Sequence, residues 1–213
     1  MKPLIKPIIM HTIRFKPYVG KNYHSQEFKV LVLGESHYLN DTDFKDFLNN
    51  EKRIELITQN VLSDYLHYKE TGKGFQKWMN TFTRFANVYS NKTLSTVEVL
   101  DFWNSISFYN YVQSPMHSAR QSPAGEDFLK SMDAFKQVVE ELQPDFVFFW
   151  GYRLWNNFPK EYYQGVEGES RKMHYIKLNR NIPFMVNPHP SSSSFNKRLK
   201  QDITDYIDTV KSV

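Results

Sequence analysis

Two short and almost continuous apolar segments constrain the fold of this chain more than any other feature. They are residues 28–33 and 145–150, and each stops at a glycine, Gly34 and Gly151 respectively. A strand with one solvated face alternates apolar and polar residues, whereas a near-continuous apolar run is typical of a strand covered on both faces. Strands of this kind occur in parallel sheets that carry helices on both sides.

Helical patterns separate these strands. Helices are predicted from Asp41 or Asp43 to Asn49, from residue 54 to the glycines at 72 and 74, over 75–89, from a Ser122-Pro123 start to residue 142, and from 195 to 210. Further strands are predicted at 105–109, 174–178 and 184–186, a loop at 160–172, and residues 97–103 remain ambiguous. The alternation predicts an α/β protein, a three-layer α/β/α sandwich with a central, mainly parallel four-stranded sheet.

Composition narrows the classes of protein that remain. The 213 residues suit one domain, 1–213, that buries about 70% of its unfolded surface. No apolar run approaches the roughly 20 residues of a membrane span, and the start lacks a secretory signal, so we expect a cytoplasmic protein with no membrane partner. The chain has no cysteine, which excludes thiolate metal sites and iron–sulfur clusters. A net charge of +4 permits a nucleic-acid partner without requiring one.

Two polar loops follow strands that are far apart in the sequence. Residues 34–38 read Gly-Glu-Ser-His-Tyr after the first strand, and residues 187–194 read Asn-Pro-His-Pro-Ser-Ser-Ser-Ser after the last. Prolines on both sides of His189 stiffen its loop, and the hydroxyls and amides that follow suit an anion. Because parallel strands end at the same edge of a sheet, we expect one site built from both loops.

Four such strand ends, taken in order, resemble the motifs of the uracil-DNA glycosylase superfamily. They are residues 34–38, the strand 106–110 that ends in asparagine, the strand 146–151 that ends in Trp-Gly, and the loop that begins at His189. The motifs span residues 28 to about 200, and the histidine loop is the most specific. The resemblance implies a single uracil-DNA-glycosylase-like domain that hydrolyses the N-glycosidic bond of uracil or another altered base in DNA.

The resemblance also implies a role for each loop. Glu35 would be the catalytic carboxylate that positions water or stabilises the sugar cation, and His189 would donate to the departing base. The implied substrate-binding residues are Ser36, His37, Tyr38 and Asn110. The candidate DNA-binding residues are Ser191, Ser192, Ser193, Lys197 and Arg198. The implied partner is DNA with a flipped nucleotide; no cofactor or metal is required, and protein partners are not indicated.

The chain departs from the family pattern at several positions. Ser36 stands where the best-studied branch has its catalytic aspartate, and Glu35 stands where another branch has a glutamate. His37 replaces a proline or small residue, and the histidine loop lacks its second proline and its leucine wedge. Phe184 or Phe195 are candidates to replace that wedge.

Several of these residues also have purely structural interpretations. His189 can cap a turn, Glu35 can cap a helix or pair with a lysine, and Asn110 can satisfy its own turn. His37 is a candidate general base or a packed loop histidine. Two other functions stay open: a nucleic-acid or nucleotide binding module whose catalysis Ser36 has weakened, and an unrelated small-molecule hydrolase.

Overall fold

The structure, a computed structural model, describes residues 13–39, 41–118, 121–166, 173–196 and 199–212. The strands are β1 (Tyr18–Val19), β2 (Val30–Gly34), β3 (Ser107–Asn110), β4 (Phe146–Trp150), β5 (Tyr163–Val166), β6 (Met173–Lys177) and β7 (Asn181–Asn187). The α-helices are α1 (Asp41–Leu48), α2 (Glu51–Glu55), α3 (Ile57–Thr71), α4 (Met79–Tyr89), α5 (Thr96–Ser105), α6 (Gly125–Lys130), α7 (Met132–Leu142), α8 (Tyr152–Asn157) and α9 (Leu199–Lys211). Two 3₁₀ helices are η1 (Tyr23–Ser25) and η2 (Lys160–Tyr162).

Within the described residues, seven strands form one mixed sheet in the order β1-β3-β2-β4-β7-β6-β5. The four central strands, β3, β2, β4 and β7, run parallel to one another. Strand β1 lies antiparallel to β3 at one edge, and the β6–β5 pair is antiparallel at the other. The predicted α/β class is therefore confirmed, whereas the prediction of a four-stranded sheet is wrong.

The strands that the sequence did not predict lie at the edges. Strand β1 has two residues, and β5 falls in the segment 160–172 that we expected to be a loop, because Gln164 and Gly165 interrupt its apolar pattern. An edge strand pairs on one side only and needs few apolar residues, so it leaves a weak periodic signal.

The sequence also placed some helix boundaries wrongly. The helix predicted from Ser122 begins instead at Gly125, and it is divided at Ser131 into α6 and α7. Ser131 Oγ donates to the carbonyl of Asp127 at 2.6 Å, which satisfies a backbone acceptor at that junction. The ambiguous segment 97–103 belongs to helix α5, which a capping box opens: Ser95 N donates to Glu98 Oε2 at 2.8 Å.

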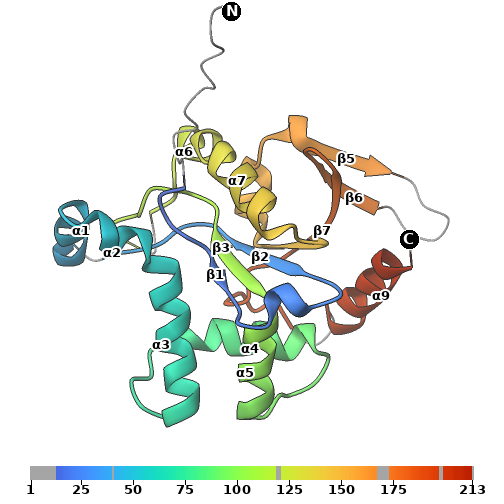
Figure 1. Cartoon of the computed structure of the whole chain (residues 1–213), viewed down its shortest axis with the longest axis horizontal. Helices are drawn as coiled ribbons and strands as arrows, with labels where there is room; N and C mark the ends of the chain where they lie inside the picture. Colours follow the sequence, from blue (N-terminus) through green and yellow to red (C-terminus); the bar gives the residue numbers. More distant parts are fainter. Residues whose placement is uncertain (1–12, 40, 119–120, 167–172, 197–198, 213) are drawn as a thin grey trace, which may run out of the picture.

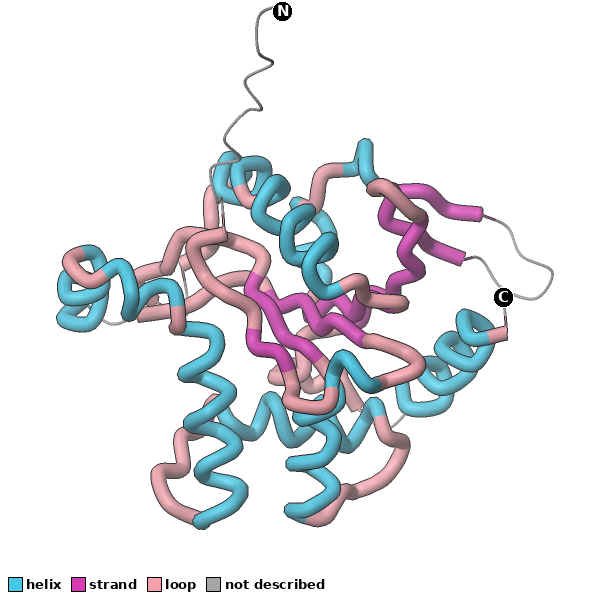
Figure 2. Tube along the Cα trace, in the orientation of Figure 1, coloured by secondary structure: helices cyan, strands magenta, loops and turns pink. Residues whose placement is uncertain are grey.

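Helices cover both faces of the sheet (Figures 1 and 2). Along β2, Val30 and Val32 face one apolar cluster, which also contains side chains of α3, α4, α5 and α9. Leu31 and Leu33 face a second cluster, to which α6, α7 and α8 contribute. Successive side chains of a strand point to opposite faces, so both faces of β2 are buried, as its apolar run predicts.

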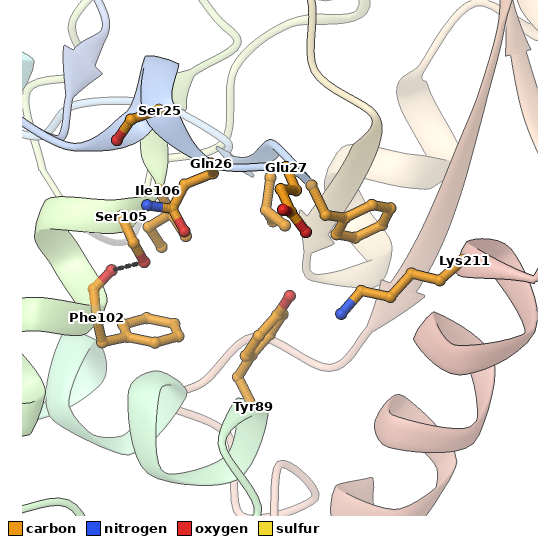
Figure 3. A pocket seen from close by; sticks show the side chains of 10 residues that line it. Ser25, Gln26, Glu27, Tyr89, Phe102, Ser105, Ile106 and Lys211 are labelled. Carbon is orange, nitrogen blue, oxygen red and sulfur yellow. Dashed lines mark hydrogen bonds between the residues drawn. The ribbon is translucent and has the colours of Figure 1, made fainter.

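A surface cavity of about 430 Å³ opens at the amino ends of the parallel strands (Figure 3). Its lining includes Val30, the first residue of β2, and Ile106, directly before β3, together with the rings of Tyr89 and Phe102. None of the described residues among those predicted to form the functional site lines this cavity. It lies at the sheet edge opposite to the strand ends that carry the predicted motifs.

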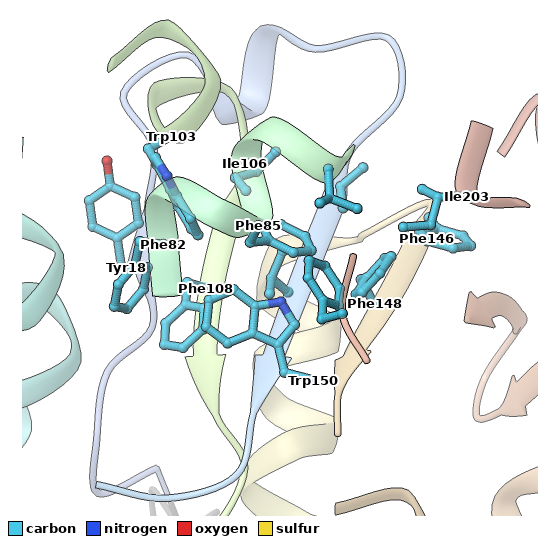
Figure 4. Packing of buried hydrophobic residues seen from close by; sticks show 14 of the residues in the cluster. Tyr18, Phe82, Phe85, Trp103, Ile106, Phe108, Phe146, Phe148, Trp150 and Ile203 are labelled. Atoms are coloured by element: carbon cyan, nitrogen blue, oxygen red, sulfur yellow. The ribbon is translucent and has the colours of Figure 1, made fainter. Parts of the chain in front are cut away.

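The first apolar cluster is dense in aromatic rings and extends along β4 from Phe146 at its start to Trp150 at its end (Figure 4). Phe85 of α4 is fully buried, and its ring centroid lies 5.0 Å from those of both Phe148 and Trp150 in β4. Aromatic rings bury large areas and pack in few geometries, so this cluster fixes the end of β4 firmly. Trp150 belongs to this cluster and also packs against His189 in the neighbouring loop.

Candidate functional site

The four parallel strands bring distant polar residues to one edge of the sheet. Gly34 at the end of β2 lies opposite Asn110 at the end of β3, and Trp150 at the end of β4 lies opposite Asn187 at the end of β7. Glu35 directly follows β2, and His189 lies two residues beyond β7. The expectation that both loops meet at one edge therefore agrees with the strand order β3-β2-β4-β7.

Glu35 is held by an arginine that the sequence did not indicate. Arg153 Nε donates to Glu35 Oε2 at 2.7 Å, and Nη2 donates to the other carboxylate oxygen. The Glu35 side chain is 9% exposed and that of Arg153 is 45% exposed. This hydrogen bonding to Glu35 raises the pKa of Arg153 above its ordinary value. A bidentate pair of this kind fixes the orientation of the carboxylate.

The same guanidinium reaches two hydroxyl groups. Nη2 lies 3.1 Å from the Tyr38 hydroxyl and Nη1 lies 2.8 Å from Ser122 Oγ. Tyr38 is 39% exposed, so its ring lies beside this cluster at the surface. Arg153 belongs to α8, a six-residue helix, and nothing in its local sequence separates it from an ordinary surface arginine. Only the distance in space reveals the link to Glu35, 118 residues away in the chain.

His189 presents one ring nitrogen as a free donor. The backbone N–H of Ser191 donates to Nδ1 at 3.2 Å, and Ser191 Oγ lies 2.7 Å from the same nitrogen. Because a backbone N–H can only donate, Nδ1 is an acceptor and the proton of the neutral ring resides on Nε2. Within the part of the chain that the structure describes, Nε2 has no hydrogen-bond partner.

The environment of His189 favours the neutral ring. Desolvation lowers its pKa, the nearby carboxylate of Glu35 opposes that shift, and Arg153 adds to it. These opposing charges indicate that the Glu35–Arg153 pair lies within electrostatic reach of the imidazole. The ring stands edge to face on Trp150, at 5.8 Å between centroids. Gly151, at φ +101°, lets the two loops approach, since an added Cβ would lie 3.4 Å from His189 Cβ.

His37 and Asn110 are buried and contact each other. The Asn110 amide nitrogen lies 3.2 Å from Nδ1 and 3.1 Å from Nε2 of His37, and Nε2 also lies 2.9 Å from Thr58 Oγ1 of α3. Burial lowers the pKa of His37 from 6.5 to about 3, so the ring is neutral at pH 7. These contacts show a structural role for both residues; their predicted contact with substrate stays a prediction.

Gly34 is what allows Asn110 to lie where it does. A Cβ on residue 34 would overlap Asn110 Oδ1 and would lie 2.9 Å from Phe108 Cζ. The glycine of the first motif therefore makes room for the amide of the second. Glycine is required at position 34 for steric and not for conformational reasons, because residue 34 has no positive φ.

Ser36 is buried and its hydroxyl is unpaired. Two other buried atoms at the strand ends, Trp150 Nε1 and Asn187 Nδ2, likewise lack a partner among the described residues. At 7% exposure, Ser36 offers no charge and little access to a substrate in this conformation. Its predicted contact with substrate also stays a prediction.

The serine loop forms a compact turn next to His189. Ser192 N donates to the His189 carbonyl at 2.8 Å, and Arg84 of α4 donates to the Pro190 carbonyl at 3.0 Å. Ser191 and Ser193 are exposed and Ser192 is half-buried. Helix α9 is described from Leu199 onward. Lys197 and Arg198, the other predicted DNA-binding residues, lie outside the described residues.

The described ranges of the chain contain neither a metal-binding cluster nor a membrane-spanning helix. No group of three histidine, aspartate or glutamate side chains that could hold a metal ion is present in those ranges. No helix in the same ranges is both long enough and apolar enough to cross a membrane.

Neither protein-family models nor curated protein sequences match this chain.

Proposed function

We propose that this protein hydrolyses the N-glycosidic bond of uracil or another altered base in DNA. The observation that carries the proposal is the placement of two groups at one edge of the parallel sheet: the carboxylate of Glu35 after β2 and the free Nε2–H of His189 after β7. Base excision needs a negative charge near the sugar and a donor near the base. The resemblance of the four strand-end motifs to the uracil-DNA glycosylase superfamily supports the same reaction.

The proposed reaction divides the charges between these two groups. The C1′–N bond breaks and its electron pair leaves with the base, whose negative oxygen or nitrogen accepts a hydrogen bond from His189 Nε2. The carboxylate of Glu35 stabilises the cation at C1′ and takes a proton from the water that adds there. The base anion then takes a proton from solvent, Glu35 returns its proton to solvent, and the products are a free base and an abasic sugar.

The test is a base-release screen with full-length protein. Oligonucleotides that carry uracil, hypoxanthine, xanthine or an alkylated base are incubated as single and double strands, and abasic sites are revealed by alkaline cleavage. We expect release from at least one substrate. His189→Ala should lower the rate by about 10²–10³, the usual cost of losing one donor to a developing anion. His67→Ala, on the exposed face of α3, is the matched control and should retain the rate.

Two glutamate variants, one in the site and one control, complete the experiment. Glu35→Gln keeps the shape of the side chain and removes its charge, so base release should fall strongly, whereas Glu70→Gln at an exposed position of α3 should leave it unchanged. Intact substrate across the whole panel, with no DNA binding, would contradict the proposal.

A second function has its own observation in favour. Ser36 occupies the position of the family aspartate, and Arg153 pairs with Glu35, so the site has less free negative charge than an unpaired aspartate and glutamate would supply. A module that binds nucleic acid or nucleotides without cleaving them fits these facts. Salt-dependent binding without base release would favour it, as would a gain of release in Ser36→Asp.

A further inference from the structure

Within the described residues, the Glu35 carboxylate accepts hydrogen bonds from Arg153 and, at a longer 3.5 Å, from the Tyr38 hydroxyl. The guanidinium occupies both carboxylate oxygens and compensates their charge. A compensated carboxylate exerts a weak field, because the attraction from the anion and the repulsion from the cation nearly cancel at a nearby sugar. Glu35 therefore needs a different partner arrangement before it acts on a cation.

The surroundings of Arg153 suit a phosphate group. Its side chain is 45% exposed, and two hydroxyls lie on it, Ser122 Oγ at 2.8 Å and Tyr38 Oη at 3.1 Å. A planar guanidinium binds phosphate in the same two-pronged manner as carboxylate. Both hydroxyls can turn so that their O–H groups donate to phosphate oxygens. The Glu35 carboxylate, at its present position, does not use these two donors fully.

We propose that Arg153, Ser122 and Tyr38 form a phosphate site that competes with Glu35 for the guanidinium, so that a phosphate of the bound nucleic acid frees the carboxylate. The part of this inference that concerns the use of the freed carboxylate rests on the proposed function. Phosphate binding itself does not. Arg153 is thus a positioning residue that couples recognition of the nucleotide backbone to the state of Glu35.

The first experiment observes the site without any reaction. The side-chain Nε–H signal of Arg153, assigned by its loss in Arg153→Lys, is followed by nitrogen NMR during titration with inorganic phosphate, with potassium chloride at equal ionic strength as the control. We expect a saturable shift. In Glu35→Gln the competing charge is gone, so phosphate should bind about two- to fivefold tighter, the range that corresponds to one partly exposed ion pair.

A second variant tests the phosphate site without altering Glu35, in case Glu35→Gln changes the fold. Ser122→Ala removes one hydroxyl of the proposed site and should weaken phosphate binding, whereas Ser118→Ala, at a neighbouring exposed serine, should not. The inference is overturned if phosphate leaves the Arg153 signal unmoved. It is equally overturned if neither Glu35→Gln nor Ser122→Ala changes the affinity in the expected direction.

The second experiment joins the site to the reaction. Base release from deoxyuridine is compared with release from its 3′,5′-bisphosphate and from a uracil-containing oligonucleotide. We expect the wild type to prefer the two phosphorylated substrates, and Arg153→Gln to lose most of this preference. If no substrate releases its base, the proposed function fails while the phosphate site is still judged by NMR. If release occurs with equal efficiency from the nucleoside, the coupling is refuted and the proposed function stands.

Discussion

Replacing Gly34 by alanine tests whether the ends of β2 and β3 are packed as the structure shows. The added methyl group would overlap Asn110 Oδ1 and lie 2.9 Å from Phe108 Cζ, and Phe108 is buried in the aromatic cluster. Asn110 has little freedom to withdraw, because its amide lies 3.1 Å from a ring nitrogen of the buried His37. The clash therefore has to be relieved by moving strand ends or breaking that contact.

The expected change in the free energy of unfolding is the balance of a packing cost and an entropy gain. Forcing an extra methyl group into a packed region costs about 1–3 kcal/mol, and the disturbed hydrogen bond adds about 1 kcal/mol. The smaller entropy of the unfolded alanine chain offsets about 0.4–1 kcal/mol. We expect Gly34→Ala to lower the free energy of unfolding by about 2 kcal/mol, and Tm by about 4–8 °C for a chain of this length.

Urea unfolding followed by circular dichroism measures the change. Gly125→Ala is the matched control, because an added Cβ meets nothing within 4 Å there, and it should be neutral or slightly stabilising. Asn110→Ser removes the overlapping oxygen, so the double variant should be less destabilised than the sum of the two single variants by about 1 kcal/mol. A cost below about 0.5 kcal/mol for Gly34→Ala, or an additive cycle, would refute this account of the packing.

Two further predictions concern the core. The pKa of His37 is lowered from 6.5 to about 3 in the folded protein. At a pH between these two values His37 is protonated in the unfolded chain and neutral in the folded chain, so the free energy of unfolding falls as the pH falls. Acidification from pH 7 to 5 should cost about 2 kcal/mol through His37 in urea unfolding, and His37→Gln, but not His67→Gln, should reduce this loss. Phe85→Ala should cost about 3–5 kcal/mol in the same assay, because the ring is fully buried, whereas Phe75→Ala, 49% exposed, should cost under about 1 kcal/mol; similar costs for both would contradict the packing of α4.

The sequence was informative about the central strands. The apolar runs that end in Gly34 and Gly151 correspond to β2 and β4, which are covered on both faces. Helix α7 likewise buries the apolar positions that its periodicity predicts, among them Phe135 and Val139. Local patterns of this kind report burial directly, since each residue in a regular element points to a face set by its position.

The sequence was less informative about short elements and about partners. Strands β1 and β5 and helix α8 are too short for periodicity to identify. The predicted set of substrate contacts included Asn110 and His37 without indicating that both are buried and in contact. Polar residue types at a strand end suggest a site, but they do not show which of them face solvent.

The amino-acid order alone determined which segments form the buried centre of the sheet, and hence that residues following β2, β3, β4 and β7 gather at one edge. Only the tertiary structure decided how those side chains are paired. Arg153 forms an ion pair with Glu35, which is 118 residues away in the sequence. Thr58 of α3 forms a hydrogen bond with His37. Periodicity is a property of contiguous residues, whereas an ion pair or hydrogen bond depends on distances between segments that only the packing of the whole chain sets.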